Sequence, residues 1–114
     1  MAPQQIMDRI TQCQAALTRG NMELKTLGIK KAEAERNYRI ALSKKLYILR
    51  SDKCPTAIIQ DVAKGTEEIS KLRQERDIAE VSYNVCLEAM RNLRLELEAY
   101  RSFLTFERVE LMNS

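Results

Sequence analysis

The chain contains no histidine and no tryptophan, and it has only three glycines and two prolines among 114 residues. So few turn-forming residues exclude a multi-stranded sheet, which needs glycine and proline in its turns. The missing histidine also excludes the Glu-x-x-His chemistry of di-metal helical bundles. The sequence has no glycine-rich phosphate loop, no nucleophile elbow and no metal-ligand spacing. We therefore expect a protein that is not an enzyme, with no catalytic residues, no metal and no cofactor.

Long hydrophobic runs are missing as well. No apolar stretch approaches the roughly 20 residues that span a bilayer, and residues 1–5 lack the basic and apolar regions of a secretory signal. The three cysteines are an odd number and none belongs to a C-x-x-C pair, which favours a reducing environment over structural disulfides. These features predict no membrane contact and a cytoplasmic location.

What the chain does contain is a repeat of apolar residues at alternating steps of three and four. The repeat runs through residues 6–48 and again through residues 69–104. This spacing is typical of a coiled-coil seam, and the 31% of charged residues fits long helices. We therefore predict an all-α fold, in which one domain of residues 1–114 forms a long antiparallel helical hairpin of coiled-coil type.

The first helix is expected at about residues 4–50. Gly20–Asn21 is its weak point, because glycine costs about 1 kcal/mol relative to alanine inside a helix, so the helix is either continuous or kinked there. Pro55 disfavours helical geometry in the residue before it. The first helix should therefore end before this proline.

The connector, residues 51–65, is expected to hold a short helix. Thr56 can cap the start of this helix, and Gly65 fits its C-terminal cap. Thr66 can then cap the second long helix. The expected boundaries are 57–64 for the short helix and about 67–107 for the second long helix.

The seam also predicts a register. Folding the halves so that Tyr38 faces Ala79 and Ala34 faces Tyr83 sets each large ring against a methyl group, as close packing requires. The same register pairs Leu27 with Met90. A second apolar set lies beside the seam, and it needs another surface to cover it. We expect that surface to be another copy of the hairpin, or else the short helix folded over part of it. The set comprises Leu42, Leu46 and Leu49 on the first helix and Ile78, Val85 and Ala89 on the second.

Charge is unevenly distributed along the chain. Residues 30–53 carry a net charge of +5, and residues 54–80 carry a net charge of −2. One interpretation is that the two segments neutralise each other across the hairpin. The other is an anion-binding patch near the bend, suited to a nucleotide or to nucleic acid. The patch would consist of Arg36, Arg39, Lys44, Arg50 and Lys53.

Three cations occupy seam positions, where a buried charge must find a partner. Either nearby glutamates pair with them, or an oligomer gathers them around a bound anion. The seam cations are Lys31, Lys45 and Arg76, and the nearby glutamates are Glu35, Glu68 and Glu75.

Four stretches of the chain resemble small helical proteins of phages and prophages of Gram-positive bacteria. They are AERNYRIAL (34–42), LRSDKCPTAII (49–59), DVAKG (61–65) and ERDIAE (75–80). The resemblance covers roughly residues 30–100 and carries no site residues. It implies a small accessory phage protein in the cytoplasm of the host cell, acting in host takeover, counter-defence, or replication and recombination.

These observations together predict a non-enzymatic protein that binds its target stoichiometrically as a self-associating helical hairpin. The target would be a host protein, such as a defence protein, or a small anionic nucleotide signal. Two alternatives remain open from the sequence. One is a nucleic-acid-binding accessory protein of phage replication or recombination, and the other is a structural coiled-coil scaffold.

Overall fold

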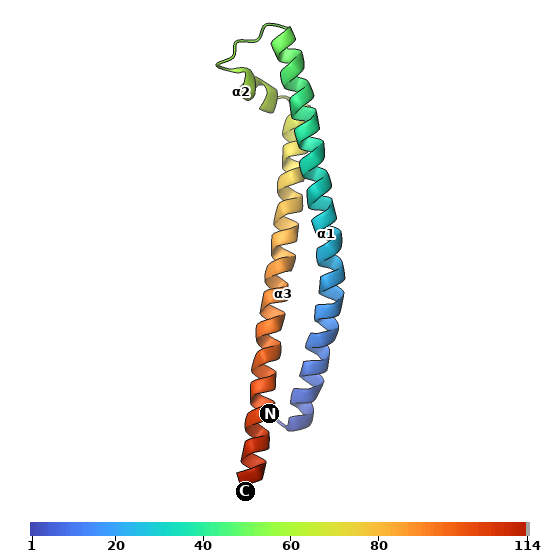
Figure 1. Ribbon diagram of the computed structural model, residues 1–114, viewed down its shortest axis with the longest axis vertical. Helices are drawn as coiled ribbons and strands as arrows, with labels where there is room; N and C mark the ends of the chain where they lie inside the picture. The colour runs from blue at the N-terminus through green and yellow to red at the C-terminus, as the bar shows by residue number, and fades with distance from the viewer. Residues whose placement is uncertain (114) are drawn as a thin grey trace. The chain divides into compact units, whose positions relative to one another are not determined.

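The computed structural model describes residues 1–113 and contains three α-helices. They are α1 (Pro3–Ser51), α2 (Ile59–Lys64) and α3 (Glu67–Asn113), as Figure 1 shows. The described residues include no strand, so the predicted all-α helical hairpin is confirmed. Helix α1 continues without interruption through Gly20–Asn21, and α3 extends beyond residue 107, where the sequence pattern placed its end.

The chain forms two compact units, and each contains a part of α1 and a part of α3. Unit 1 combines Met1–Lys25 with the described residues from Asn84 onward. Unit 2 is the continuous segment Thr26–Tyr83, which also contains α2. Each unit has buried residues of its own, so each can be described separately.

The core of unit 1 depends on a glycine. Met90 is only 1% exposed, and a Cβ atom on Gly20 would overlap its thioether. The missing side chain of Gly20 therefore makes the space that Met90 fills, which gives a physical reason for a glycine at this position inside α1. The Cys86 thiol lies 3.8 Å from the Gly20 carbonyl oxygen, to which it donates a weak hydrogen bond. The other buried residues of unit 1 are Ile6, Cys13 and Leu97.

The contact between Gly20 and Met90 shows that the predicted register is wrong. That register paired Met90 with Leu27, which lies one heptad further along α1. A shift by one heptad keeps every seam residue on the seam, so the repeat by itself is compatible with both registers. The structure adopts the register in which the gap at Gly20 receives the long flexible side chain of Met90.

Unit 2 buries Tyr38 and Ile69 of the long helices together with two residues of α2. These residues of α2, Ile59 and Ala63, are 6% and 0% exposed. Tyr83 packs next to Gly28, where an added Cβ would lie 3.4 Å from the ring. Unlike the gap at Gly20, this spacing is an ordinary van der Waals contact. Unit 2 is therefore built from both long helices and the short connector helix.

The caps around α2 differ from the prediction. The Ile58 amide donates to the Pro55 carbonyl at 3.1 Å, so a turn occupies the residues expected to start the helix. As a result Ile58 takes the N-cap position, without a side-chain hydrogen bond, and Thr56 does not cap. Gly65 does take the C-cap position, but with a right-handed φ of −81°. The Thr66 hydroxyl donates to the Ala63 carbonyl at 2.8 Å, whereas the predicted cap would need it to accept from an amide of α3.

The end of α1 is a Schellman turn formed without glycine. The Lys53 amide donates to the Arg50 carbonyl at 3.1 Å, and the Cys54 amide donates to the Leu49 carbonyl at 2.9 Å. These two bonds are the pair that defines the motif. The motif needs a left-handed residue, and Lys53 supplies it with a φ of 63°. Pro55 follows immediately and cannot continue the helix.

Candidate binding surfaces

Arg76 lies at the centre of a polar network in unit 2. Its guanidinium carbon is 4.4 Å from the centre of the Tyr38 ring. Its Nη2 donates to Asp77 Oδ1 at 3.0 Å, and its Nε lies 3.7 Å from Glu35 Oε2. The hydrogen bond to Asp77 raises the pKa of the guanidinium above its ordinary value. Glu35 also accepts a 2.7 Å hydrogen bond from Arg39, so this seam cation is satisfied by the chain itself.

The other two seam cations have different surroundings. The Lys31 ammonium lies over the Tyr83 ring, 4.8 Å from its centre, in a cation–π contact. Lys45 is half-buried and forms no ion pair with any described residue. Within residues 1–113, one ion pair joins α1 to α3, and it is the pair of Glu35 with Arg76. The expected neutralisation of the basic segment across the hairpin is thus limited to that pair.

A hollow of about 410 Å³ lies between the long helices of unit 2, and we call it the central hollow. Two of its three cations, Arg39 and Arg76, form ion pairs with Glu35, and Glu80 adds a second carboxylate to the wall. An anion would therefore have to displace existing charge interactions in order to bind there. The lining residues are Gly28, Lys31, Ala32, Glu35, Arg39, Arg76 and Glu80.

A second hollow, of about 350 Å³, has unpaired cations, and we call it the lysine hollow. Neither Lys44 nor Lys45 forms an ion pair within the described residues. The single carboxylate in the wall is Glu68 of α3, more than 4 Å from either ammonium. The lining residues are Asn37, Ile40, Ala41, Lys44, Lys45, Ile48 and Glu68.

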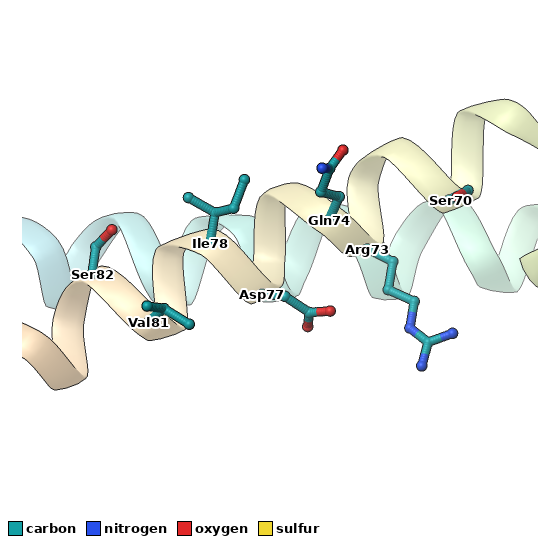
Figure 2. Close-up of a pocket in the computed structure, with 7 residues that line it drawn as sticks. All are labelled: Ser70, Arg73, Gln74, Asp77, Ile78, Val81 and Ser82. Atoms are coloured by element: carbon teal, nitrogen blue, oxygen red, sulfur yellow. The ribbon is translucent and has the colours of Figure 1, made fainter.

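Two further hollows lie on single helices of unit 2. The α1 face is lined by Arg39, Leu42, Ser43, Leu46, Tyr47 and Arg50, and Tyr47 is 72% exposed. The α3 face, shown in Figure 2, is lined by Ser70, Arg73, Gln74, Asp77, Ile78, Val81 and Ser82. On the α3 face, Ile78 and Val81 are 57% and 61% exposed.

The eight predicted anion-binding residues are distributed over three hollows and open surface. Lys31, Arg39 and Arg76 line the central hollow, and the other five divide between the lysine hollow, the α1 face and open surface. Lys44 and Lys45 line the lysine hollow, Arg50 lines the α1 face, and Arg36 and Lys53 are exposed side chains without an ion pair in the described part of the chain.

The predicted apolar interface residues are placed in both units. Leu42 and Leu46 lie on the α1 face, with Leu49 half-buried nearby in α1, and Ile78 lies on the α3 face. In unit 1, Val85 and Ala89 are exposed. The sequence analysis missed Tyr47 and Val81. Val81 lies three residues after Ile78 and four before Val85, so a search for apolar residues at helical spacing from the predicted set would have found it. Tyr47 lies neither three nor four residues from a predicted apolar residue, so this signal does not find it.

Reactive groups and metal ligands are not gathered in the described part of the chain. Residues 1–113 contain no group of three or more histidine, cysteine or acidic residues that could hold a metal ion. Burial raises the pKa of the Cys13 thiol, and the negative charge of Glu96 raises it further. This thiol therefore stays protonated and is a poor nucleophile.

Within residues 1–113, neither long helix has a stretch apolar enough to cross a membrane. Comparisons with protein-family models, curated proteins and solved structures find no match for the chain.

Proposed function

We propose that this chain is a non-enzymatic protein that binds a small anionic ligand stoichiometrically in the lysine hollow. The observation that supports this proposal is that Lys44 and Lys45 line one hollow without an ion pair among the described residues. Ammonium groups form charge-assisted hydrogen bonds with phosphate or carboxylate oxygens. The amide of Asn37 in the same wall supplies a further hydrogen-bond donor.

The remaining wall of the lysine hollow suggests what kind of anion fits. Ile40 and Ile48 offer apolar contact to a flat or ring-shaped group. Glu68, on the α3 side, repels negative charge, so the charge of the ligand should be concentrated on the α1 side. A nucleotide has this character, since its phosphate is at one end and its base at the other. The volume of about 350 Å³ falls within the range of small-ligand sites.

In the phage setting that the resemblance implies, the ligand would be a nucleotide signal used by the host. Binding without hydrolysis would lower the free concentration of that signal. An acidic segment of a host defence protein is the corresponding protein target, since it presents the same carboxylate chemistry. Both actions require only stoichiometric binding, which agrees with a chain that has no histidine.

Calorimetric titration of the purified protein with nucleoside mono- and diphosphates tests the proposal. The double variant Lys44→Gln/Lys45→Gln should weaken binding at least tenfold, because it removes both ammonium groups. The variant Glu68→Gln should strengthen binding, because it removes the repelling carboxylate. A matched control is Lys25→Gln/Lys30→Gln, which lowers the net charge equally at two exposed lysines of α1. Equal losses in the two double variants, or weaker binding by Glu68→Gln, would contradict the proposal.

Nucleic-acid binding is a second candidate, and the exposed ring of Tyr47 is the observation that favours it. Tyr47 lies on the α1 face with Arg39 and Arg50. An aromatic ring beside cations can stack on a base while the cations contact phosphates. Fluorescence anisotropy with single-stranded oligonucleotides over a salt series tests this function. Arg50→Gln should reduce the salt slope by about one, whereas Tyr47→Ala should weaken binding and leave the slope unchanged. Affinity that does not depend on salt would reject the candidate.

A further inference from the structure

We propose that a second copy of this chain docks on unit 1 through α3 alone, with the two α3 helices parallel to each other. The part of α3 in unit 1 carries a second set of residues at alternating steps of three and four, besides the seam. We call this set the outer stripe. It consists of Asn92, Leu95, Ala99, Ser102, Phe106 and Val109.

The seam and the outer stripe lie on different sides of α3. Each residue of the outer stripe follows a seam residue by two positions, which is about 200° around the helix. On the seam, Met90 and Leu97 are 1% and 7% exposed. On the outer stripe all six residues are exposed, and Leu95 and Phe106 are 64% and 61% exposed. The outer stripe is therefore a continuous, uncovered strip on a single helix, with the spacing that helix pairs use.

The middle of the outer stripe is hollowed. A space of about 510 Å³ is lined by Ala99, Ser102, Phe103 and Phe106, all of which are uncharged. In a parallel helix pair, each stripe side chain enters a hole between stripe side chains of the facing helix. Phe106 of one copy would enter the hole between Ser102 and Val109 of the other, next to its own counterpart. The small residues thus leave room for the ring that the second copy supplies.

The start of the outer stripe favours two copies in register. An asparagine at one stripe position specifies register and oligomeric state in parallel coiled coils. Its amide both donates and accepts hydrogen bonds, so Asn92 can bind its own counterpart. Four residues earlier the same spacing reaches Glu88, whose carboxylate would meet a second carboxylate. We therefore place the start of the contact at Asn92.

Charge selects the orientation of the second copy. One flank of the outer stripe carries four arginines and one glutamate, a net charge of +3, and the other carries three glutamates, a net charge of −3. Parallel two-fold packing sets the basic flank of each copy against the acidic flank of the other, whereas antiparallel packing sets like charges together. The basic flank comprises Arg91, Arg94, Glu98, Arg101 and Arg108. The acidic flank comprises Glu96, Glu107 and Glu110.

Arg91 and Glu96 form the pair that parallel packing would bring together. They border the stripe on its two sides, where flanking residues of facing helices form salt bridges that set orientation. Arg91 of one copy then meets Glu96 of the other, and the symmetry repeats this pair. The Arg91 side chain is 61% exposed and lies 3.3 Å from Glu88 of its own helix. A guanidinium has five N–H donors, so Arg91 can bind both carboxylates.

The length of the outer stripe limits the strength of the dimer. Asn92 to Val109 spans roughly 26 Å at 1.5 Å per residue, and a helix is about 10 Å wide. The resulting projected area of roughly 260 Å² per copy is in the range of weak, transient contacts. We therefore expect a dissociation constant of about 100 μM.

Sedimentation velocity of the full chain between about 10 μM and 1 mM tests the contact. The protein should change from monomer to dimer across this range. Leu95→Lys should raise the dissociation constant at least tenfold, because it sets two ammonium groups against each other. Met7→Lys is the matched control, since Met7 is 50% exposed on α1 of unit 1, and it should leave the constant unchanged. Circular dichroism verifies that both variants remain folded.

Charge reversal and cross-linking test the parallel orientation. Arg91→Glu and Glu96→Arg should each raise the dissociation constant at least threefold. The double variant Arg91→Glu/Glu96→Arg should restore it, because each copy then offers the exchanged charges. Under mild oxidation at 1 mM, Ala99→Cys should form a covalent dimer, because residue 99 meets its own counterpart. The control Ala15→Cys is exposed on α1 of unit 1, and it should dimerise no faster than the unsubstituted protein.

Three results would overturn the inference. A monomer at 1 mM would show that the outer stripe has no affinity for a second copy. Equal effects of Leu95→Lys and Met7→Lys would place the contact away from the outer stripe. A double reversal no better than the single variants, or equal cross-linking of the two cysteine variants, would exclude the parallel pair. The nucleotide titrations are independent of these results, because the lysine hollow is in unit 2 and the outer stripe is in unit 1.

Discussion

Replacing Lys53 with glycine should stabilise the protein, although it removes a cation from the end of α1. Lys53 has a left-handed φ of 63°, and it is held there by its own hydrogen bond to Arg50 and by the bond from Cys54 to Leu49. An L-residue in this conformation brings its Cβ too close to the following carbonyl oxygen. Glycine has no Cβ and adopts the same conformation without that cost.

The expected gain is the difference between one favourable and two unfavourable contributions. Relief of the left-handed conformation contributes about 1–2 kcal/mol. The greater freedom of glycine in the unfolded chain offsets about 0.4–1 kcal/mol of this. Loss of a cation near the C-terminus of a helix costs about 0.3 kcal/mol. The net effect is about 0.5 kcal/mol of added stability, which corresponds to an increase in the melting temperature of about 2–4 °C.

Urea and thermal unfolding, followed by circular dichroism at a fixed protein concentration, measure this difference. Concentration is fixed because any self-association would shift the apparent stability. Two variants serve as controls. Lys53→Ala removes the charge and keeps the Cβ, so it should not stabilise the protein. Lys44→Gly makes the same change inside α1 and should destabilise by about 1 kcal/mol. If Lys53→Gly and Lys53→Ala have equal stability, the left-handed geometry does not determine the effect and the reasoning is refuted.

Three further predictions concern the helix interface and its charges. Gly28→Ala should stabilise the protein by about 1 kcal/mol through helix propensity. Gly20→Ala should destabilise it by about 1 kcal/mol, because the added methyl group overlaps the buried thioether of Met90. Urea unfolding of both variants tests this difference, and equal effects would contradict it. Because burial raises the pKa of Cys13, the folded state keeps the proton longer than the unfolded state. The contribution of this thiol to stability should therefore be constant below a pH of about 8.5 and fall as the pH rises toward the folded pKa. In urea unfolding from pH 7 to 10, Cys13→Ala should lose less stability than the unsubstituted protein. An equal loss would exclude this thiol as the cause. Arg76→Lys should cost about 1 kcal/mol in unfolding experiments, because an ammonium cannot reproduce a planar stack on an aromatic ring, whereas the exposed control Arg73→Lys should change little.

The fold class was predictable because it depends on features that are local in sequence. The alternating repeat predicts long helices wherever it occurs, and Pro55 prevents the first helix from continuing. The structure agrees, with α1 ending at Ser51 and α3 starting at Glu67. The details of the caps were less predictable. Thr56 has a suitable side chain for capping, but the turn from Pro55 to Ile58 takes up the backbone that the cap would need.

The candidate sites were predictable only as a set of residue types. Composition identifies an excess of cations in residues 30–53, but it does not show which of them find partners within the chain. Arg76 is satisfied by an aromatic ring and two carboxylates. Lys45 also lies on the seam, yet it has no ion pair in the described residues. The distinction depends on contacts between segments that are far apart in sequence.

The sequence by itself determined that this protein is a helical hairpin, because helix periodicity and turn chemistry act over a few residues. Only the tertiary structure decided the register. A seven-residue repeat fits equally well after a shift of one heptad, so the choice depends on the shape of a single contact, where Met90 fills the gap at Gly20. The register in turn determines which charges meet across the helices. For this reason the lysine hollow and the central hollow, which residues of both helices line, emerge only when both helices are in place.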